Sequence, residues 1–299
     1  MKNNRKYLLS ILVASFCFGL IPIFGQFLTN NHVSSFKQTF FMETLAFMII
    51  FPLYFFFLKV KKINKKDIVF FLLFGASVFL VNLMPLTAIA LSMPVALVSL
   101  LLYIYPGFTL ILSSIWFGDK ITFKKIIFVL IALLGVGCIL GGGLSAGIVT
   151  VPGVLAALAG GISLAFWACF GRASSLKGYK PFDSLFWSEV GAIILLIISI
   201  FIFPRIFPQQ MIGSFNFSFT GTTIGLLIAL AIICVVIGHS LFFYGVEKIK
   251  PLQASIVALF EPVTAVVLSA ILFGQTLSWW TLLGGVLVFS SSLLLNAGE

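Results

Sequence analysis

Three carboxylates lie inside long apolar stretches of the sequence, where an unpaired charge is costly. Glu43 and Glu189 stand 146 residues apart at corresponding places in two such stretches, and Glu261 stands directly before Pro262 in a third. A charge in an apolar medium must be paired, or neutralised by a proton, to be tolerated. Carboxylates in such places are therefore typical of proton sites, gates and contacts between helices.

A proline follows a polar side chain in the middle of two related apolar stretches. These stretches, offset by 156 residues, align without a gap at seven of twenty positions, and Tyr105-Pro106 falls on Glu261-Pro262. Proline removes a backbone donor and kinks a helix, which exposes carbonyl oxygens. Paired interruptions in two repeats indicate a binding site. The alternative is that the kinks only shape packing and that Glu261 only braces the bundle.

Other polar and aromatic side chains fall at positions from which they could reach the same cavity. Asn82 and His239 are one residue away from equivalence under the 156-residue shift. Histidine titrates near neutral pH, so His239 is a candidate proton carrier, or else a neutral group bonded to a neighbouring helix. The aromatic residues that could line the cavity, or instead face lipid or the core, are Tyr103, Tyr105, Trp167, Phe242 and Tyr244.

The composition places these residues in a membrane. Of 299 residues, 61% are hydrophobic and 9% are charged, against roughly 25% charged in a soluble domain. The apolar runs are continuous rather than alternating, which predicts helices and excludes a β-barrel. Ten runs approach the roughly 20 residues that span a bilayer, with limits near 8–28, 36–58, 68–91, 94–117, 124–141, 151–171, 183–203, 221–245, 251–273 and 279–296. The predicted fold class is therefore an all-α integral membrane protein with ten transmembrane helices.

Nothing in the sequence indicates a cofactor or an enzyme. The four cysteines all lie within apolar runs, and none has metal-ligand spacing with a histidine. We interpret them as packing residues without a disulfide framework. The sequence contains no phosphate-binding loop, no histidine cluster and no Ser-His-Asp arrangement. We therefore expect neither a metal nor a catalytic centre.

The basic residues orient the spans. With the N-terminus inside, 16 of the 18 Lys and Arg residues fall in inner segments, while Lys37 and Arg205 fall outside. Inner loops of membrane proteins carry an excess of Lys and Arg. The sequence therefore predicts that both termini are cytoplasmic. This asymmetry also explains the net charge of +10 without a nucleic-acid partner.

The spans divide into two repeats, residues 1–145 and 146–299, that form one membrane domain. Five spans per repeat is an odd number, so the repeats must lie upside down relative to each other. The loops agree, because the segment after Gly118 is basic and its counterpart after Gly274 is uncharged. Inverted repeats are typical of secondary transporters, which bind their substrate near the midplane between the repeats.

Inversion also predicts where two of the carboxylates lie. At about 1.5 Å of rise per residue, Glu43 and Glu189 would each lie roughly 10 Å from their own membrane face. Inversion would then place them at opposite depths, one nearer each side. Two roles remain open for them: gating or proton-relay groups, or structural groups that reach the lipid headgroups or bond a neighbouring helix.

The order of short motifs resembles a known family. The motifs are Phe18-Gly19, Trp167-Ala168, Tyr105-Pro106 and Glu261-Pro262, with Phe117-Gly118 and Phe273-Gly274 near the ends of the corresponding spans. Together they resemble the drug/metabolite transporter superfamily, EamA type, over essentially the whole chain. Asp119 and Gln275 depart from the glutamate that the family usually has there, and Glu43 stands where the family often has an arginine nearby. The last departure points to a different substrate.

The resemblance implies a secondary transporter that moves a small polar metabolite, an amino acid or similar, across the cytoplasmic membrane by alternating access, in the direction of efflux. We further expect coupling to protons, with Glu261 or His239 taking part, because a proton removes the cost of a charge held at membrane depth. A nucleotide-sugar or purine-type carrier is the alternative within the same class. An integral membrane enzyme would need a polar cluster at one membrane interface, and a scaffold or channel subunit would not need buried carboxylates at symmetric positions.

The predicted orientation can be tested by labelling single cysteines in a variant that lacks the four native ones. Cysteines at Ser92 and Gln275 should react with a membrane-impermeant thiol reagent added to intact cells, because both positions are predicted to lie outside. A cysteine at Lys62 should react only after the cells are permeabilised. The reverse pattern would contradict the predicted topology.

Overall fold

A computed structural model describes residues 4–57, 62–91, 93, 95–141, 149–206, 219–274 and 278–297. Ser92 and Gln275, the two outer labelling positions, lie outside these residues. The described backbone consists of helices joined by short turns, and contains no strand. Nine helical segments in it are long and apolar enough to cross a membrane, and the tenth predicted run forms a shorter apolar helix, Trp279–Leu295. The predicted all-α membrane fold is therefore confirmed.

The helices follow the predicted runs closely, but several spans consist of two pieces. In the first half these are α1 (Arg5–Gly19), α2 (Ile21–Asn30), α3 (Ser35–Pro52), η1 (Leu53–Phe57), η2 (Lys65–Asp67), α4 (Ile68–Ala90), α5 (Val95–Leu102), α6 (Tyr105–Phe117) and α7 (Phe123–Gly141). In the second half they are α8 (Val151–Leu176), α9 (Pro181–Ile206), α11 (Gly221–Leu230), η3 (Ala231–His239), α12 (Ser240–Val246), α13 (Pro251–Ala258), α14 (Phe260–Phe273) and α15 (Trp279–Ala297).

The two halves use the same local chemistry at equivalent positions. Gly118 and Gly274 end α6 and α14 in the left-handed conformation, at φ values of 69° and 65°. Glycine adopts this conformation without the steric cost of a Cβ atom. The matching glycines therefore mark the same structural event in both repeats, the end of the fourth span of each half.

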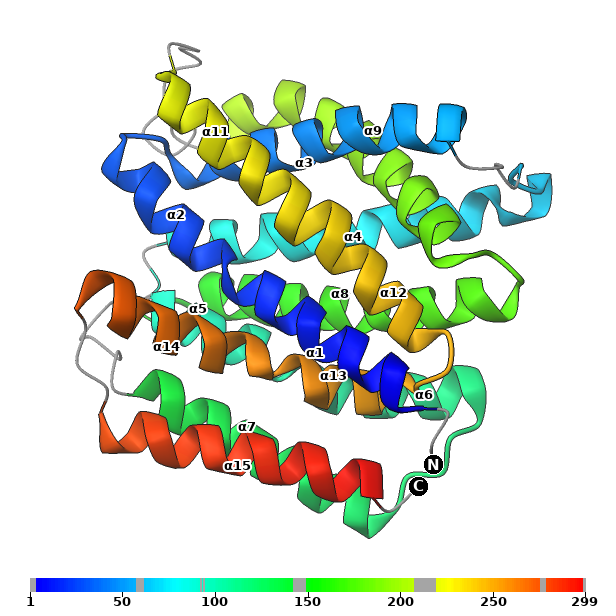
Figure 1. Ribbon diagram of the computed structural model, residues 1–299, viewed down its shortest axis with the longest axis vertical. Helices are drawn as coiled ribbons and strands as arrows, with labels where there is room; N and C mark the ends of the chain where they lie inside the picture. Colours follow the sequence, from blue (N-terminus) through cyan, green and yellow to red (C-terminus); the bar gives the residue numbers. More distant parts are fainter. Residues whose placement is uncertain are drawn as a thin grey trace.

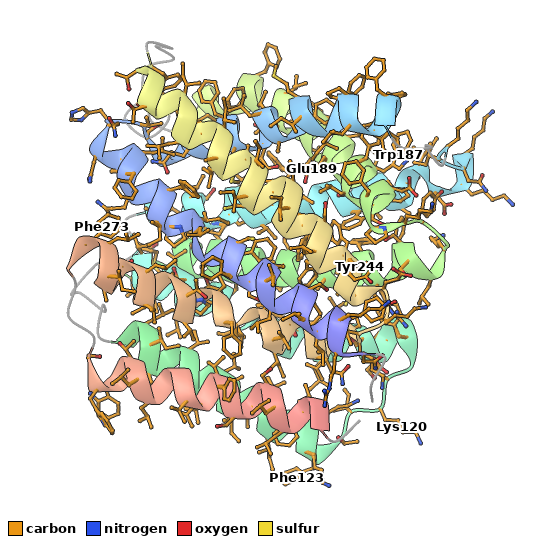
Figure 2. The ribbon with its side chains drawn as sticks, in the orientation of Figure 1. Lys120, Phe123, Trp187, Glu189, Tyr244 and Phe273 are labelled. Atoms are coloured by element: carbon orange, nitrogen blue, oxygen red, sulfur yellow. The ribbon has the colours of Figure 1, made fainter. Side chains whose placement is uncertain are left out.

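The halves are inverted relative to each other. The chain runs across the bundle in opposite directions in α5–α6 and in α13–α14 (Figure 1). Lys120, just after α6, lies at one edge of the molecule, and Phe273, at the end of α14, lies at the opposite edge (Figure 2). The fold is therefore two inverted five-span repeats whose helices interleave, and the start of α1 and the end of α15 lie on the side of Lys120.

Close contact between helices of different halves holds the bundle together. Helix α4 packs on both α8 and α9, and α7 packs on α15. At the crossing of α4 and α9 the two helix backbones meet at Gly75 and Gly191, and a Cβ atom added to Gly75 would lie 2.5 Å from the Cα atom of Gly191. Small residues allow such backbone approach between helices in lipid, where apolar burial offers little driving force.

This crossing generates a stability prediction. Gly75→Ala should lower the free energy of unfolding by about 1–3 kcal/mol, because the backbone that it meets cannot rotate away. Gly225→Ala is the matched control, since a Cβ atom there would meet nothing within 4 Å. The measurement is thermal unfolding of the purified protein in detergent. Equal melting temperatures for Gly75→Ala and Gly225→Ala would contradict the close crossing.

Candidate functional site

A cavity of about 110 Å³ lies inside the bundle and is bounded by both halves. The first half contributes side chains from α1 to α5 and from the α5–α6 turn, and the second half contributes side chains from α8, η3 and α14. Its lining residues are Phe18, Ile21, Met42, Glu43, Val78, Val81, Asn82, Leu102, Tyr103, Leu164, Trp167, Cys234, Val235, His239 and Glu261. Six of the residues predicted from the sequence therefore meet in one place: Glu43, Asn82, Tyr103, Trp167, His239 and Glu261.

The helices of the fourth and ninth spans are interrupted where they reach this cavity. Helix α5 ends at Leu102 and α6 begins at Tyr105, while α13 ends at Ala258 and α14 begins at Phe260. Pro106 and Pro262 each lie in the first turn of the second piece, where proline is tolerated because its missing N–H would have no partner. The two prolines thus start new helices beside the cavity rather than bending continuous ones.

The two interruptions are bonded to each other. The hydroxyl of Tyr103 donates a hydrogen bond of 2.8 Å to Oε1 of Glu261. The hydroxyl of Tyr105 donates a hydrogen bond of 2.7 Å to the backbone carbonyl of Ser255. Both bonds cross between the halves, so polar groups that the interruptions leave in the membrane interior satisfy one another.

Glu43 and Glu189 form the second polar centre, which we call the acidic pair. Oε1 of Glu43 accepts a hydrogen bond of 2.8 Å from Asn82, and Oε1 of Glu189 lies 3.2 Å from Nδ1 of His239. Their carboxyl groups also lie close enough to interact directly. Both residues are buried, with 4% and 0% of their surface exposed, and Figure 2 shows Glu189 in the interior.

The expectation that these two glutamates lie at opposite depths is wrong. Each is the ninth residue of its helix, about 12 Å from the helix start at 1.5 Å per residue. That distance approaches half of the roughly 30 Å hydrocarbon core. Two antiparallel helices that each carry a glutamate near mid-length can bring the two side chains together, and inversion then aligns them rather than separating them.

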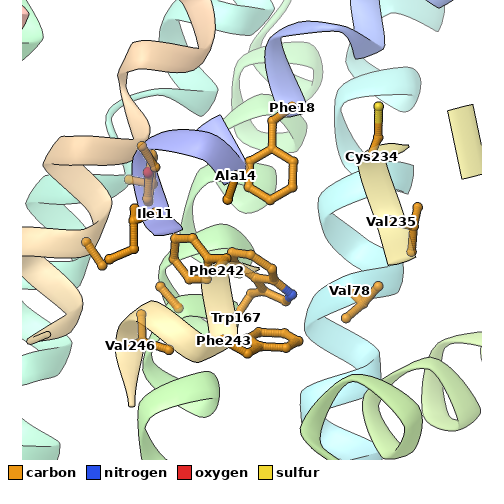
Figure 3. Packing of buried hydrophobic residues seen from close by; sticks show 14 of the residues in the cluster. Ile11, Ala14, Phe18, Val78, Trp167, Cys234, Val235, Phe242, Phe243 and Val246 are labelled. Carbon is orange, nitrogen blue, oxygen red and sulfur yellow. The ribbon is translucent and has the colours of Figure 1, made fainter. Parts of the chain in front are cut away.

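Aromatic rings form the wall of the cavity beside these polar groups. The ring of Trp167 lies 4.3 Å from that of Phe242 and 5.2 Å from that of His239, measured between centroids. Phe18 packs edge-on against Trp167 at 6.2 Å. Figure 3 shows Phe18, Trp167 and Phe242 gathered in the core, with Val78 and Val235 across from them. The cavity therefore has the aromatic side chains of Phe18 and Trp167 in its wall, together with carboxyl groups.

The structure leaves other predicted site residues outside the lining. Glu189 reaches the site only through its contacts with Glu43 and His239, and Phe242 packs behind Trp167. Tyr105 is buried between the halves through its bond to Ser255, and Pro106 and Pro262 support the helix starts. Tyr244 packs on Tyr7, with ring centroids 4.9 Å apart, and Figure 2 places it toward the side of Lys120.

Sequence reasoning did not identify the apolar lining residues, such as Met42, Val78 and Val235. In a chain of continuous apolar runs, nothing in the pattern distinguishes a cavity-facing valine from a lipid-facing one. It also missed the π-helical segment η3, which ends at His239. Such segments are frequent at functional sites.

A second, smaller cavity of about 30 Å³ adjoins the first and shares Glu43, Val78 and Asn82 with it. It extends between α3, α4 and α9 toward the helix ends that carry Phe36 and Ser199. The acidic pair therefore lies beside the junction of the two cavities.

The polar groups that line the cavity carry no fixed positive charge. Within the described part of the chain, no three His, Cys, Asp or Glu side chains are grouped as metal ligands. The cavity lining contains carboxyl groups, one imidazole, one amide and one phenol, and no Lys or Arg. Carboxylates and aromatic faces both attract ammonium groups.

Comparison with known proteins places this geometry in a family context. The EamA-like transporter family model matches twice, over residues 5–141 and 151–297. An "Uncharacterized transporter" of Archaeoglobus fulgidus is 29% identical, over 76% of this chain and 77% of the relative. Proteins named "Probable amino-acid metabolite efflux pump" are 26% identical in Escherichia coli K12 and 24% identical in Salmonella typhimurium LT2, each over 68% of both chains.

A solved crystal structure shares the fold. It superposes with a TM-score of 0.79 over 98% of both chains at 17% sequence identity. The family model covers nearly all of the chain and matches each half separately, in agreement with the two repeats. The protein is therefore a multi-pass membrane protein that belongs to the EamA-like transporter family.

Proposed function

We propose that the protein carries a small polar solute, an amino acid or a similar metabolite, across the cytoplasmic membrane by alternating access. The observation that carries this proposal is the cavity between two inverted halves, at the level of their paired helix interruptions. Such a position is typical of the substrate sites of secondary transporters. Rocking of one half against the other would expose the cavity to each side in turn.

The bonds between the halves support this mechanism. The hydrogen bonds from Tyr103 to Glu261 and from Tyr105 to Ser255 hold the two interruptions together in the present conformation. A typical hydrogen bond contributes only about 0.5–1.5 kcal/mol, and about 1.5–3 kcal/mol when one partner is charged. A contact of that strength is stable in one state and can still be broken within a transport cycle.

The size and chemistry of the cavity favour a small solute with an ammonium group. Its volume of about 110 Å³ is below the 300–1,000 Å³ of sites for drug-sized ligands. Glu43 offers carboxyl oxygens to an ammonium group, and the ring of Trp167 offers a cation–π face. The absence of Lys and Arg from the lining supports a nucleotide-sugar substrate less well, because its phosphates would have no cationic partner.

Two further features of the proposal rest on other support. The relatives named as amino-acid metabolite efflux pumps, at 24% and 26% identity, support export of an amino acid or a related compound. The excess of Lys and Arg in one set of loops supports a cytoplasmic location of both termini. A membrane enzyme is supported less well, since the polar groups converge in the bundle interior rather than at an interface.

Transport itself can be tested with purified protein in liposomes. Exchange of a small radiolabelled amino acid such as alanine or threonine should exceed that of protein-free liposomes and saturate with concentration. Val235→Trp should abolish exchange by filling the cavity that Val235 lines. Leu130→Trp, at a position 53% exposed on the bundle surface, is the matched control and should retain it. Exchange by Val235→Trp at the wild-type rate would contradict the location of the site.

Proton coupling, with Glu261 or His239 taking part, is the second part of the proposal. An imposed pH gradient should drive accumulation of the solute in liposomes that contain the wild-type protein. Glu261→Gln or His239→Ala should abolish this accumulation but leave exchange at equal pH, because the variants lose a protonation site and keep the cavity. A wild-type protein that only equilibrates the solute, whatever the gradient, would show that the buried groups serve structure alone.

A further inference from the structure

We infer that Glu43 and Glu189 hold a single proton between them, so that the acidic pair is a proton-binding site at the contact between the two halves. As a step in a transport cycle this inference rests on the proposed function. Its test, however, reads bound protons and stability in the purified protein, so either proposal can fail without the other.

The first support is the bonding of the two carboxyl groups. Each uses Oε1 for an outside partner, Asn82 for Glu43 and His239 for Glu189. Oε2 of each is buried and has no hydrogen-bond partner among the described residues. Buried polar atoms are nearly always satisfied, so two such oxygens on neighbouring carboxyl groups require an explanation. A carboxylate can only accept a hydrogen bond, and the missing element is therefore a donor.

The second support is the proximity of the two groups. The carboxyl groups of Glu43 and Glu189 are close enough to interact with each other, and the side chains are almost completely buried. Two ionised carboxylates would repel strongly in so apolar a place. A pair of carboxyl groups that shares one site keeps one proton for this reason. One proton removes one charge and provides an O–H donor for the opposing oxygen.

The ionisable groups around the acidic pair already have hydrogen-bond partners, so a shared proton is the means by which the pair lowers its charge. Among the described residues, the elements packed on α3 and α9 present one titratable group to the acidic pair, His239 of η3, which already bonds Glu189. Glu261 and Tyr103 face the same cavity but are bonded to each other. Arg172 of α8 donates to the backbone carbonyl groups of Val246 and Glu247.

The position of the pair gives the proton a mechanical role. Glu43 belongs to α3 of the first half and Glu189 to α9 of the second, so the shared proton bonds the halves to each other. The smaller cavity begins at Glu43 and runs between α3, α4 and α9. Release of the proton would leave two carboxylates in contact, and their repulsion would separate α3 from α9 along this cavity. The site is thus a contact between the halves that closes when it binds a proton.

Infrared difference spectroscopy of the detergent-purified protein tests the inference without any substrate. The wild type should show a protonated-carboxyl band at neutral pH that is missing from both Glu43→Gln and Glu189→Gln. Either variant removes the shared proton, because the glutamine amide donates to the remaining carboxylate in its place. Glu247→Gln, which changes a carboxyl group outside the site, is the control and should keep the band. Retention of the band in either variant, or the loss of a different band in each, would overturn the inference.

The pH dependence of thermal unfolding gives a second measurement. The unfolded chain releases this proton in the acid range, near the ordinary pKa of a glutamate, while the folded protein keeps it, so wild-type stability should fall as the pH rises from the acid range through neutrality, until the folded pair also loses its proton. Glu43→Gln and Glu189→Gln should flatten this fall, because an amide donates at any pH, and Glu247→Gln should retain the wild-type slope. An unchanged slope in both pair variants would show that the pair holds no proton.

Discussion

Every polar group inside this bundle must find a partner within the bundle, because lipid supplies none. This constraint explains why the interruptions of the fourth and ninth spans face each other. Each interruption frees backbone and side-chain groups, and the hydroxyl groups of Tyr103 and Tyr105 cross from one half to satisfy Glu261 and Ser255 of the other. The hydroxyl groups that satisfy the interrupted helices inside the membrane therefore also connect the two repeats.

The acidic pair meets the same constraint differently. Glu43 and Glu189 have side-chain partners for one oxygen each, and their remaining oxygens find no donor in the described part of the chain. A proton that binds and dissociates can supply the hydrogen-bond donor that these oxygens lack. Unsatisfied oxygens are useful in a carrier, because a site whose hydrogen bonds were all made within the protein would have no affinity left for a proton or a solute.

The repeat, the spans and most of the polar site residues could be predicted from the sequence, for identifiable physical reasons. The ends of the fourth and ninth spans could be predicted at Gly118 and Gly274, because only glycine ends a helix in the left-handed conformation without strain. Glu43, His239 and Glu261 could be identified as site candidates because ionisable residues are rare in apolar runs.

The relative depth of the glutamates could not be predicted, because it depends on where a span begins and on how two helices cross, and apolar composition fixes neither. The apolar residues that line the cavity could not be predicted either. Val78 and Val235 line the cavity, while Val69 and Val286 are 65% and 61% exposed on the bundle surface. Their sequence neighbourhoods are all apolar, and only the tertiary packing separates them.

If one cavity between the halves opens to each side in turn, as we propose, a residue that lines it must be accessible from both sides of the membrane. The measurement is the rate at which a small impermeant thiol reagent modifies Val78→Cys in a background without native cysteines, from each side of the membrane in oriented vesicles. Alternating access predicts that Val78→Cys is modified from both sides and that a saturating concentration of the amino acid that exchanges best slows this modification, while Leu130→Cys on the bundle surface shows no protection. Modification from one side only, or at a rate that the amino acid does not change, would contradict it.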